Sequence, residues 1–376
     1  MSIATVLCLL LSGVIFLIVL GHVVVWLLYV PMAARLFREA LWLPAPWREA
    51  LERAGEPVVL HTDDGTRLEG TYLPTTARQR KGVIAFCHEL NGNRWTTIPY
   101  TESLRQSGYD VFTFDFRNHG ASDCITDFEP MPWVTGYDVS DVLAAVDYLC
   151  SRADADPHGV GILGISKGGT AALCAAARDP RVRALVIDGL VPTERMQIHY
   201  ARRFMSIYAP CLCKWFARLP DVSFRLTAAV TRALVQRQRK CRFVNVDQAA
   251  RRVRQPVMMI HGGRDGHIPV EVVRALRNSM PNGTRFWVIP DAKHNGGIAV
   301  AGEAYHRRIA RFFDLHMGTV PPPRGVRRPL RLRRRPQPTL APVGVNGNGS
   351  SARNRNGRPE GNRNGHVAAN RNGTPS

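Results

Sequence analysis

The chain has 376 residues, of which 45% are hydrophobic, and it carries a formal net charge of +20. This length and apolar content are sufficient for one large core with additional segments at each end, and they exclude a chain that is disordered throughout. Residues 192–255 and 317–376 each carry a net charge of +11, so the basic excess lies outside the segments expected to form the core. Nucleic acid, an anionic membrane surface or no partner at all are the alternatives for these two segments.

An uncharged apolar segment begins the chain. Residues 3–30 contain no Asp, Glu, Lys or Arg. As a helix they would be about 42 Å long, which exceeds the ~30 Å hydrocarbon core of a bilayer. A cleaved signal peptide is the alternative, but it needs a basic start and a shorter apolar centre. We therefore expect residues 1–34 to be a retained transmembrane anchor, followed by an interfacial connector over residues 35–56.

The charges around this segment predict its orientation. No Lys or Arg precedes it, whereas four arginines follow it: Arg35, Arg38, Arg48 and Arg53. Cationic residues are concentrated on the cytoplasmic side of membrane helices. The sequence therefore predicts a single-pass membrane protein whose C-terminal body is cytoplasmic.

Over residues 57–316, short apolar runs alternate with helical stretches. Strands are expected at residues 58–62, 67–73, 82–88, 110–115, 159–164, 184–188, 257–261 and 285–289. Amphipathic helices are expected at residues 139–150, 167–178, 270–280 and 302–316. Several strands are apolar almost throughout, as in a parallel sheet that helices cover on both faces. The first two strands lack an intervening helix and should form an antiparallel hairpin, so we predict an α/β fold with an eight-stranded, mostly parallel sheet.

Two basic segments complete the predicted organisation. Residues 192–255 have a helical pattern and should form a cap inserted over the carboxyl edge of the sheet. The large apolar residues of the cap either line an acyl pocket or pack the cap onto the core: Phe204, Met205, Tyr208, Trp215, Phe216 and Phe224. Cys211 and Cys213 have no second pair of ligands nearby and do not indicate a zinc site. Residues 317–376 are rich in Pro, Gly, Asn and Arg, and we expect a disordered basic tail.

The sequence GISKGG at residues 164–169 is the sharpest chemical signal. It follows an apolar strand and precedes an alanine-rich helix, which is the context that a nucleophile elbow requires. A glycine-rich turn without chemistry is the alternative. In the functional interpretation Ser166 is the nucleophile, and its place at a helix N-terminus brings backbone N–H groups beside the reacting centre.

A serine nucleophile needs a base that is itself oriented by a carboxylate. Asp265 lies in HGGRDGHIP and His294 in DAKHN, and each follows an apolar strand in the order serine, acid, histidine. We therefore predict a catalytic triad of Ser166, Asp265 and His294. Asp291 is a weaker candidate for the acid and His267 for the base, because neither fits the spacing as well.

Acyl transfer also needs donors for an oxyanion. One predicted donor is the backbone N–H of Lys167, the residue after the nucleophile. The other should come from the loop CHELNGNRWT, residues 87–96, where the N–H of Leu90 is the first choice and that of Glu89 the second. The side chain of Lys167 is expected to be solvated rather than catalytic.

Five motifs in order, CHELNGNR, FDFRNHGASD, GISKGG, HGGRDGHIP and DAKHN, resemble the α/β-hydrolase superfamily, in particular its serine aminopeptidase-like and esterase branches. The resemblance covers about residues 57–316. It implies a Ser–Asp–His hydrolase that needs no metal and no cofactor. It also implies a structural loop that contains Asp115, Arg117, His119 and Gly120. The chain departs from the family pattern at His88-Glu89, where His-Gly is usual, so a carboxyl side chain is added near the predicted oxyanion site.

These features together predict a membrane-anchored serine hydrolase that cleaves an ester, thioester or amide through an acyl-enzyme. The alternatives are a peptidase that uses the same triad and a non-catalytic adaptor on a hydrolase scaffold, for which Glu89 is the main support. The anchor and the basic cap favour an acyl substrate at an anionic membrane surface. The tail is expected either to contact anionic lipid or to have no partner. Nucleic acid is disfavoured because no aromatic residues accompany the tail arginines.

Overall fold

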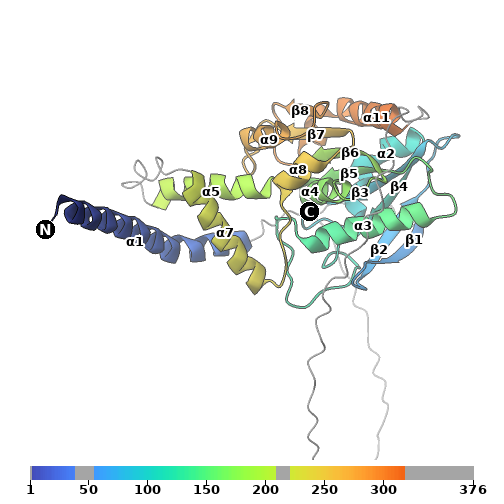
Figure 1. Ribbon diagram of the computed structural model, residues 1–376. Coiled ribbons are helices and arrows are strands. Elements are labelled where there is room, and N and C mark those ends of the chain that lie inside the picture. The colour runs from blue at the N-terminus through green and yellow to red at the C-terminus, as the bar shows by residue number, and fades with distance from the viewer. Residues whose placement is uncertain (1, 39–54, 209–220, 318–376) are drawn as a thin grey trace, which may run out of the picture. The chain divides into compact units, whose positions relative to one another are not determined.

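An eight-stranded sheet forms the centre of the computed structural model, which describes residues 2–38, 55–208 and 221–317 (Figure 1). The strands are β1 (Glu56–His61), β2 (Arg67–Leu73), β3 (Gly82–Cys87), β4 (Tyr109–Phe114), β5 (Val160–Ile165), β6 (Val182–Asp188), β7 (Val257–Gly262) and β8 (Arg285–Ile289). Their spatial order is β1-β2-β4-β3-β5-β6-β7-β8. β2 pairs antiparallel with β1 and β4, and all other neighbours are parallel. The eight predicted strands, the hairpin and the mostly parallel sheet are therefore confirmed.

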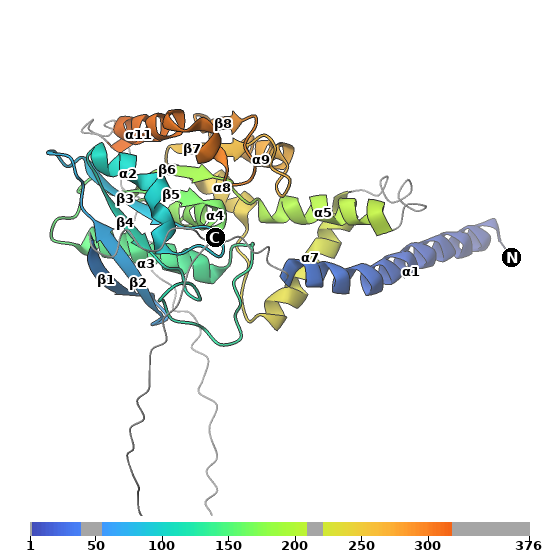
Figure 2. The same ribbon diagram turned by 180° about the vertical axis from the view of Figure 1, so that it is seen from behind.

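Helices cover both faces of this sheet, which explains why its central strands are apolar throughout. In β5, Ile162 belongs to the core beneath one set of helices, and Leu163 belongs to the core on the other face. Figures 1 and 2 show the two layers on opposite sides of the sheet. The first layer contains α3 (Gly136–Ser151) and α4 (Ser166–Ala176), and the second contains α2 (Ile98–Gln106) and α11 (Glu303–Met317). The side chains on both faces of such a strand therefore lie in apolar surroundings.

The helices predicted near residues 139–150, 167–178, 270–280 and 302–316 correspond to α3, α4, α9 (Val270–Arg277) and α11. Three short elements were not predicted: η1 (Arg94–Thr97), α2 and α10 (Gly297–Ala301). Each has nine residues or fewer, and α2 buries only Tyr100, Thr101 and Leu104. Such short segments do not display enough turns for a helical period to be recognised.

The insertion between β6 and β7 is helical, as predicted. It contains α5 (Thr193–Tyr208), α7 (Asp221–Gln238) and α8 (Val246–Arg252), whereas residues 209–220 lie outside the described chain. Phe224 is buried, and the guanidinium of Arg202 lies 5.0 Å from the centre of its ring. This contact favours a packing role for Phe224. Phe204, Met205 and Tyr208 lie on α5, but their side chains are not described, and Trp215, Phe216 and both cap cysteines lie outside the described residues.

The N-terminal segment forms one helix, α1 (Ile3–Arg38), which extends beyond the predicted anchor of residues 1–34. Its residues Ile3–Gly21 have a mean hydropathy of 3.0, and by length and composition this stretch is sufficient to cross a membrane. A signal sequence would satisfy the same criterion. Residues 39–54 of the predicted connector and residues 318–376 of the predicted tail lie outside the described chain.

Candidate functional site

Ser166 occupies the sharp turn between β5 and α4. Its φ angle is +50°, in the left-handed region that residues with side chains rarely adopt. The strand and the helix approach each other so closely that a Cβ atom on Gly164 would lie 2.4 Å from the Cα of Gly169. Glycine is therefore required beside the turn, and the turn itself holds Ser166 in a strained conformation of the kind found at functional sites.

The three predicted side chains form one hydrogen-bonded chain. Ser166 Oγ lies 2.9 Å from His294 Nε2, and His294 Nδ1 lies 2.7 Å from Asp265 Oδ2. An ionised carboxylate can only accept a hydrogen bond, so Nδ1 carries the ring proton and donates it to Asp265. Nε2 then has a free lone pair and accepts the hydroxyl hydrogen of Ser166. The residues converge because they follow β5, β7 and β8, whose carboxyl ends lie at the same edge of the sheet.

Asp265 is held by more than its contact with His294. Its second oxygen, Oδ1, accepts hydrogen bonds from the backbone N–H groups of His267 and Ile268, both at 2.9 Å. Burial by itself would raise the pKa of Asp265, but the hydrogen bonds from His294 and Ile268 favour the ionised form and lower the pKa overall. The site therefore holds an ionised carboxylate in a fixed orientation against the imidazole.

The weaker candidates lie elsewhere. Asp291 is exposed and forms an ion pair with Arg264 at 3.0 Å. His267 is also exposed, and its ring meets the ring of His294 edge to face with centroids 5.9 Å apart. Neither residue occupies a position in the chain of hydrogen bonds that connects Ser166 to Asp265.

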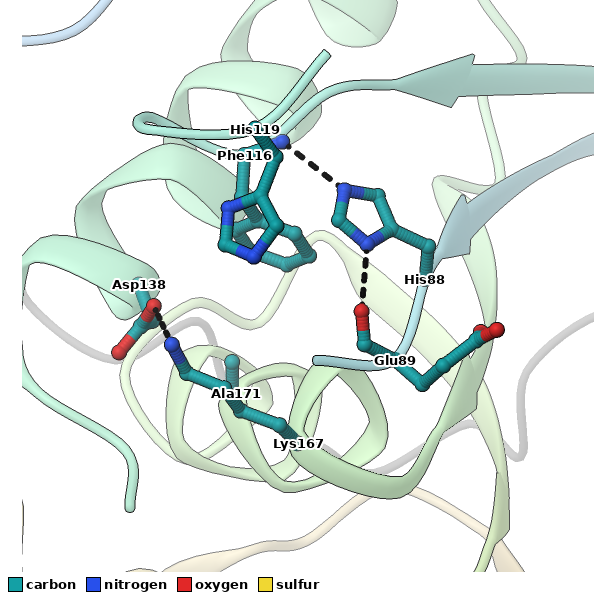
Figure 3. A pocket seen from close by; sticks show the side chains of 7 residues that line it. All are labelled: His88, Glu89, Phe116, His119, Asp138, Lys167 and Ala171. Atoms are coloured by element: carbon teal, nitrogen blue, oxygen red, sulfur yellow. Dashed lines mark hydrogen bonds and ion pairs between the residues drawn. The ribbon is translucent and has the colours of Figure 1, made fainter. Parts of the chain in front are cut away.

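A buried histidine orients the loop after β3. The backbone N–H of Phe116 donates to His88 Nε2 at 3.1 Å, so His88 Nδ1 carries the proton and donates to the carbonyl oxygen of Glu89 at 2.7 Å (Figure 3). In a trans peptide the C=O and N–H groups point in opposite directions. The N–H of Leu90 therefore points away from His88. Burial lowers the pKa of His88 to about 4, which keeps this neutral tautomer at pH 7.

The prediction that the side chain of Lys167 is solvated is wrong. Lys167 is only 5% exposed, and its Nζ lies 2.9 Å from Oδ1 of Asp138, which is also buried (Figure 3). The pairing was missed because Asp138 lies on another helix, α3, and no local pattern connects the two residues. Only the packing of α3 against α4 brings them together.

The contacts around Asp115 are those of a structural loop. Its carboxylate accepts hydrogen bonds from the backbone N–H groups of Arg94 and Ala121, at 2.6 and 2.9 Å. Gly120 has a φ of +53°, and a Cβ atom there would lie 2.1 Å from the same carboxylate. His119 donates from Nδ1 to the carbonyl oxygen of Arg117 at 2.9 Å. These residues support one another rather than the hydrogen-bonded chain of Ser166.

Asp188 is a buried carboxyl beside the site that the sequence did not reveal. It is the last residue of β6, is 1% exposed, and accepts a hydrogen bond from the hydroxyl of Tyr305 at 2.9 Å. The next residue, Gly189, lies directly against the imidazole, because a Cβ atom there would be 3.1 Å from Cε1 of His294. The signal that could have identified Asp188 is its position at the carboxyl end of a strand.

Replacing Asp188 with asparagine should remove one pH dependence of stability. Burial raises the pKa of Asp188 to about 6, above the ~3.9 of an unfolded aspartate. Between these two pKa values the folded state keeps a proton that the unfolded state has already released. The free energy of unfolding therefore falls by about 3 kcal/mol as the pH rises through this window.

Urea unfolding at pH 4 and pH 7.5 would measure this effect in the wild type and in Asp188→Asn. The variant should gain stability relative to the wild type by about 3 kcal/mol between the two pH values. An unchanged difference would show that Asp188 does not titrate in this window.

Comparisons with known proteins agree with this architecture. The model of the "Alpha/beta hydrolase family" matches residues 84–312. An uncharacterised protein of Mycobacterium tuberculosis is 26% identical over 271 residues, which cover 72% of this chain and 83% of that protein. An uncharacterised protein of Escherichia coli K12 is 23% identical over 280 residues, covering 73% of this chain and 84% of its own.

Solved structures show the same fold. An esterase of Pyrococcus furiosus superimposes with a TM-score of 0.55 at 21% identity, over 74% of this chain and 98% of the esterase. An alpha/beta hydrolase of Penicillium sp. superimposes with a TM-score of 0.53 at 19% identity, over 70% of this chain and 99% of that one. At these identities the solved structures establish the fold, whereas the family match covers more than half of the sequence itself. This chain belongs to the alpha/beta hydrolase family.

Proposed function

We propose that this protein is a serine hydrolase that cleaves carboxylic esters through an acyl-enzyme intermediate. The observation that supports this proposal most strongly is the hydrogen-bonded chain from Ser166 through His294 to Asp265, with separations of 2.9 and 2.7 Å. A serine at a strained strand–helix turn, a histidine that can accept its proton and a carboxylate that fixes the histidine tautomer are the three groups that acyl transfer requires.

The proposed reaction has two stages. Ser166 Oγ attacks the ester carbonyl carbon while His294 Nε2 takes the hydroxyl proton, and Asp265 stabilises the imidazolium that forms. His294 then returns the proton to the leaving alcohol, so the alcohol departs and the acyl group remains on Ser166. Water, activated by the same imidazole, hydrolyses this ester and releases the carboxylic acid. No step in this sequence requires a metal or a cofactor.

Two backbone N–H groups are proposed to bind the oxyanion that develops during attack. The N–H of Lys167 lies in the first turn of α4, where helix N–H groups are unpaired within the helix. The N–H of Leu90 belongs to the peptide whose carbonyl oxygen is held by His88. Donors fixed in advance in this way stabilise negative charge without a further cost of reorientation.

Labelling with a fluorophosphonate probe tests the nucleophile directly. The wild type should be labelled, and Ser166→Ala should lose the label completely. Ser103→Ala is a matched control, because Ser103 also contacts a histidine, His306, at 3.0 Å but lies within helix α2 rather than at a strained turn. Labelling that persists in Ser166→Ala would contradict Ser166 as the nucleophile. A wild type that is not labelled would contradict the proposal and favour a non-catalytic adaptor.

The choice of esters over peptides rests on the fold shared with an esterase and needs a separate measurement. We expect kcat/KM for p-nitrophenyl esters to exceed that for aminoacyl anilides by at least about 100-fold, because p-nitrophenolate is a much better leaving group than the nitrogen of an anilide. Faster turnover of the anilides would identify a peptidase with the same nucleophile.

We also propose that α1 is a retained membrane anchor and that the body is cytoplasmic. The apolar stretch Ile3–Gly21 and the arginines that come after the apolar segment support this arrangement. The full chain should resist carbonate extraction from membranes, and protease should digest its body only when added from the cytoplasmic side. A soluble product that lacks the first residues would instead identify a cleaved signal sequence. Binding to vesicles with and without anionic lipid would test whether the basic cap and tail contact anionic lipid.

A further inference from the structure

The buried ion pair between Lys167 and Asp138 has no role in the proposed reaction and needs an explanation. Both residues are almost completely buried, with 5% and 2% of their surfaces exposed. Removing two charges from water costs several kcal/mol per ion, so apolar residues of similar volume are often equally stable at such positions. Stability alone therefore does not account for a charged pair directly after the nucleophile.

Asp138 is held firmly by the helix on which it lies. It is the third residue of α3, and its Oδ2 accepts hydrogen bonds from both the backbone N–H and the hydroxyl of Thr135, each at 2.8 Å. This capping box leaves Oδ1 for Lys167, at 2.9 Å. The ion pair thus connects the first turn of α3 to the first turn of α4, immediately after the strained backbone of Ser166.

Lys167 also lines the same pocket as His88, the residue that orients the peptide of the second proposed oxyanion donor. Figure 3 shows the side chain of Lys167 and the ring of His88 on the walls of one small cavity, with the backbone of Glu89 beside them. The His88 tautomer that holds the Glu89 carbonyl must accept the N–H of Phe116, so His88 has to remain neutral. Burial lowers the pKa of His88 most strongly; the ammonium of Lys167 lowers it as well, whereas the Glu89 carbonyl and the Asp138 carboxylate raise it.

We propose that the Lys167–Asp138 ion pair positions the oxyanion hole. Through its side chain Lys167 fixes its own backbone N–H against α3, and across the cavity it supports the His88 contact that orients the N–H of Leu90. Lys167 is therefore a positioning residue whose side chain acts through two backbone donors. This inference rests on the proposed hydrolase function and assigns a role to a residue type that the nucleophile turn itself does not require.

Two variants each remove the charge of one partner of the ion pair. Lys167→Met keeps most of the length of the side chain, and Asp138→Asn keeps its shape and an acceptor for Thr135. With p-nitrophenyl acetate, each should lower kcat by about 10- to 100-fold, less than the 10²- to 10³-fold expected for a lost oxyanion donor. KM should change by less than about threefold, because the ester is still bound. The affinity for phenylboronic acid, which forms a tetrahedral anion on the serine, should fall in parallel with kcat.

The double variant should lose no more activity than either single variant, because the two residues act as one unit. Lys81→Met is the matched control, since Lys81 pairs with Asp314 at 2.8 Å near the start of β3 and should leave kcat unchanged. If Lys167→Met does not fold, Asp138→Asn alone provides the kcat and boronate measurements.

Three results would overturn the inference: a folded Lys167→Met or Asp138→Asn with kcat within about twofold of the wild type, losses that multiply in the double variant, or a change confined to KM. Wild-type labelling at Ser166 alongside any of these results would leave the hydrolase proposal intact. A wild type that the fluorophosphonate does not label would instead contradict the hydrolase proposal and the inference together.

Discussion

Replacing Asp265 with asparagine should lower kcat by about 10³- to 10⁴-fold while leaving the fold intact. The carboxylate accepts three hydrogen bonds, one from His294 through Oδ2 and two from backbone N–H groups through Oδ1. An amide of the same shape has only one oxygen. If that oxygen faces the backbone, the NH₂ group faces His294, which then presents the wrong tautomer to Ser166.

The alternative orientation of the amide is no better. If its oxygen faces His294, the NH₂ group meets the two backbone N–H donors of residues 267 and 268, and the loop after β7 has to move. Either arrangement removes the negative charge that stabilises the imidazolium during attack. The loss should therefore appear in kcat and in the rate of fluorophosphonate labelling, with KM changed little.

Asp291→Asn is the matched control for this substitution. Asp291 is an exposed aspartate in the loop after the next strand, paired with Arg264, and its amide variant should retain activity within about twofold. Loss of activity in Asp291→Asn together with an active Asp265→Asn would show that the acid follows β8 rather than β7 and would contradict the proposed triad.

Replacing Gly168 with alanine should destabilise the protein by about 3 kcal/mol or prevent folding. A Cβ atom on Gly168 would lie 2.2 Å from the carbonyl oxygen of His88 and 2.4 Å from that of Cys87. Both obstacles are backbone atoms at the end of β3, so no side-chain rotation can relieve the clash. The first turn of α4 would have to move away from β3, and the nucleophile would move with it.

Gly136→Ala provides the comparison. A Cβ atom on this helical glycine would make an ordinary contact of 3.9 Å with the carbonyl oxygen of Arg242, and alanine favours a helix. Urea unfolding should show a lower midpoint for Gly168→Ala and an equal or higher midpoint for Gly136→Ala. A Gly168→Ala variant with wild-type stability would mean that β3 and α4 are less closely packed than the structure shows.

The parts of the fold that could be predicted from the sequence are the buried strands and the serine turn. A parallel strand between two helical layers must be apolar on both faces, so β3, β5 and β7 are recognisable without any partner. The serine turn is equally local, because its glycines, strand and helix are consecutive. The proposed acid and base are polar residues a few positions after β7 and β8, in the expected order.

Long-range packing decided the rest. The short helix α2 was missed because its stability comes from contacts with the sheet rather than from a helical period. Asp188 belongs to no motif, and its proximity to His294 follows from the order of β6, β7 and β8 in the sheet. The burial of Lys167 depends on a carboxylate of α3, and the tautomer of His88 depends on a backbone N–H of residue 116.

The sequence by itself determined the α/β architecture and the three residues proposed for catalysis, because both depend on patterns within a few consecutive residues. Only the tertiary structure decided which polar groups surround them. Hydrogen bonds and ion pairs join single atoms to within a few tenths of an ångström, and partners such as His88 with Phe116 and Asp188 with Tyr305 are separated by 28 and 117 positions along the chain. Such contacts form only after the helices and strands have packed, so they cannot be predicted from composition and spacing.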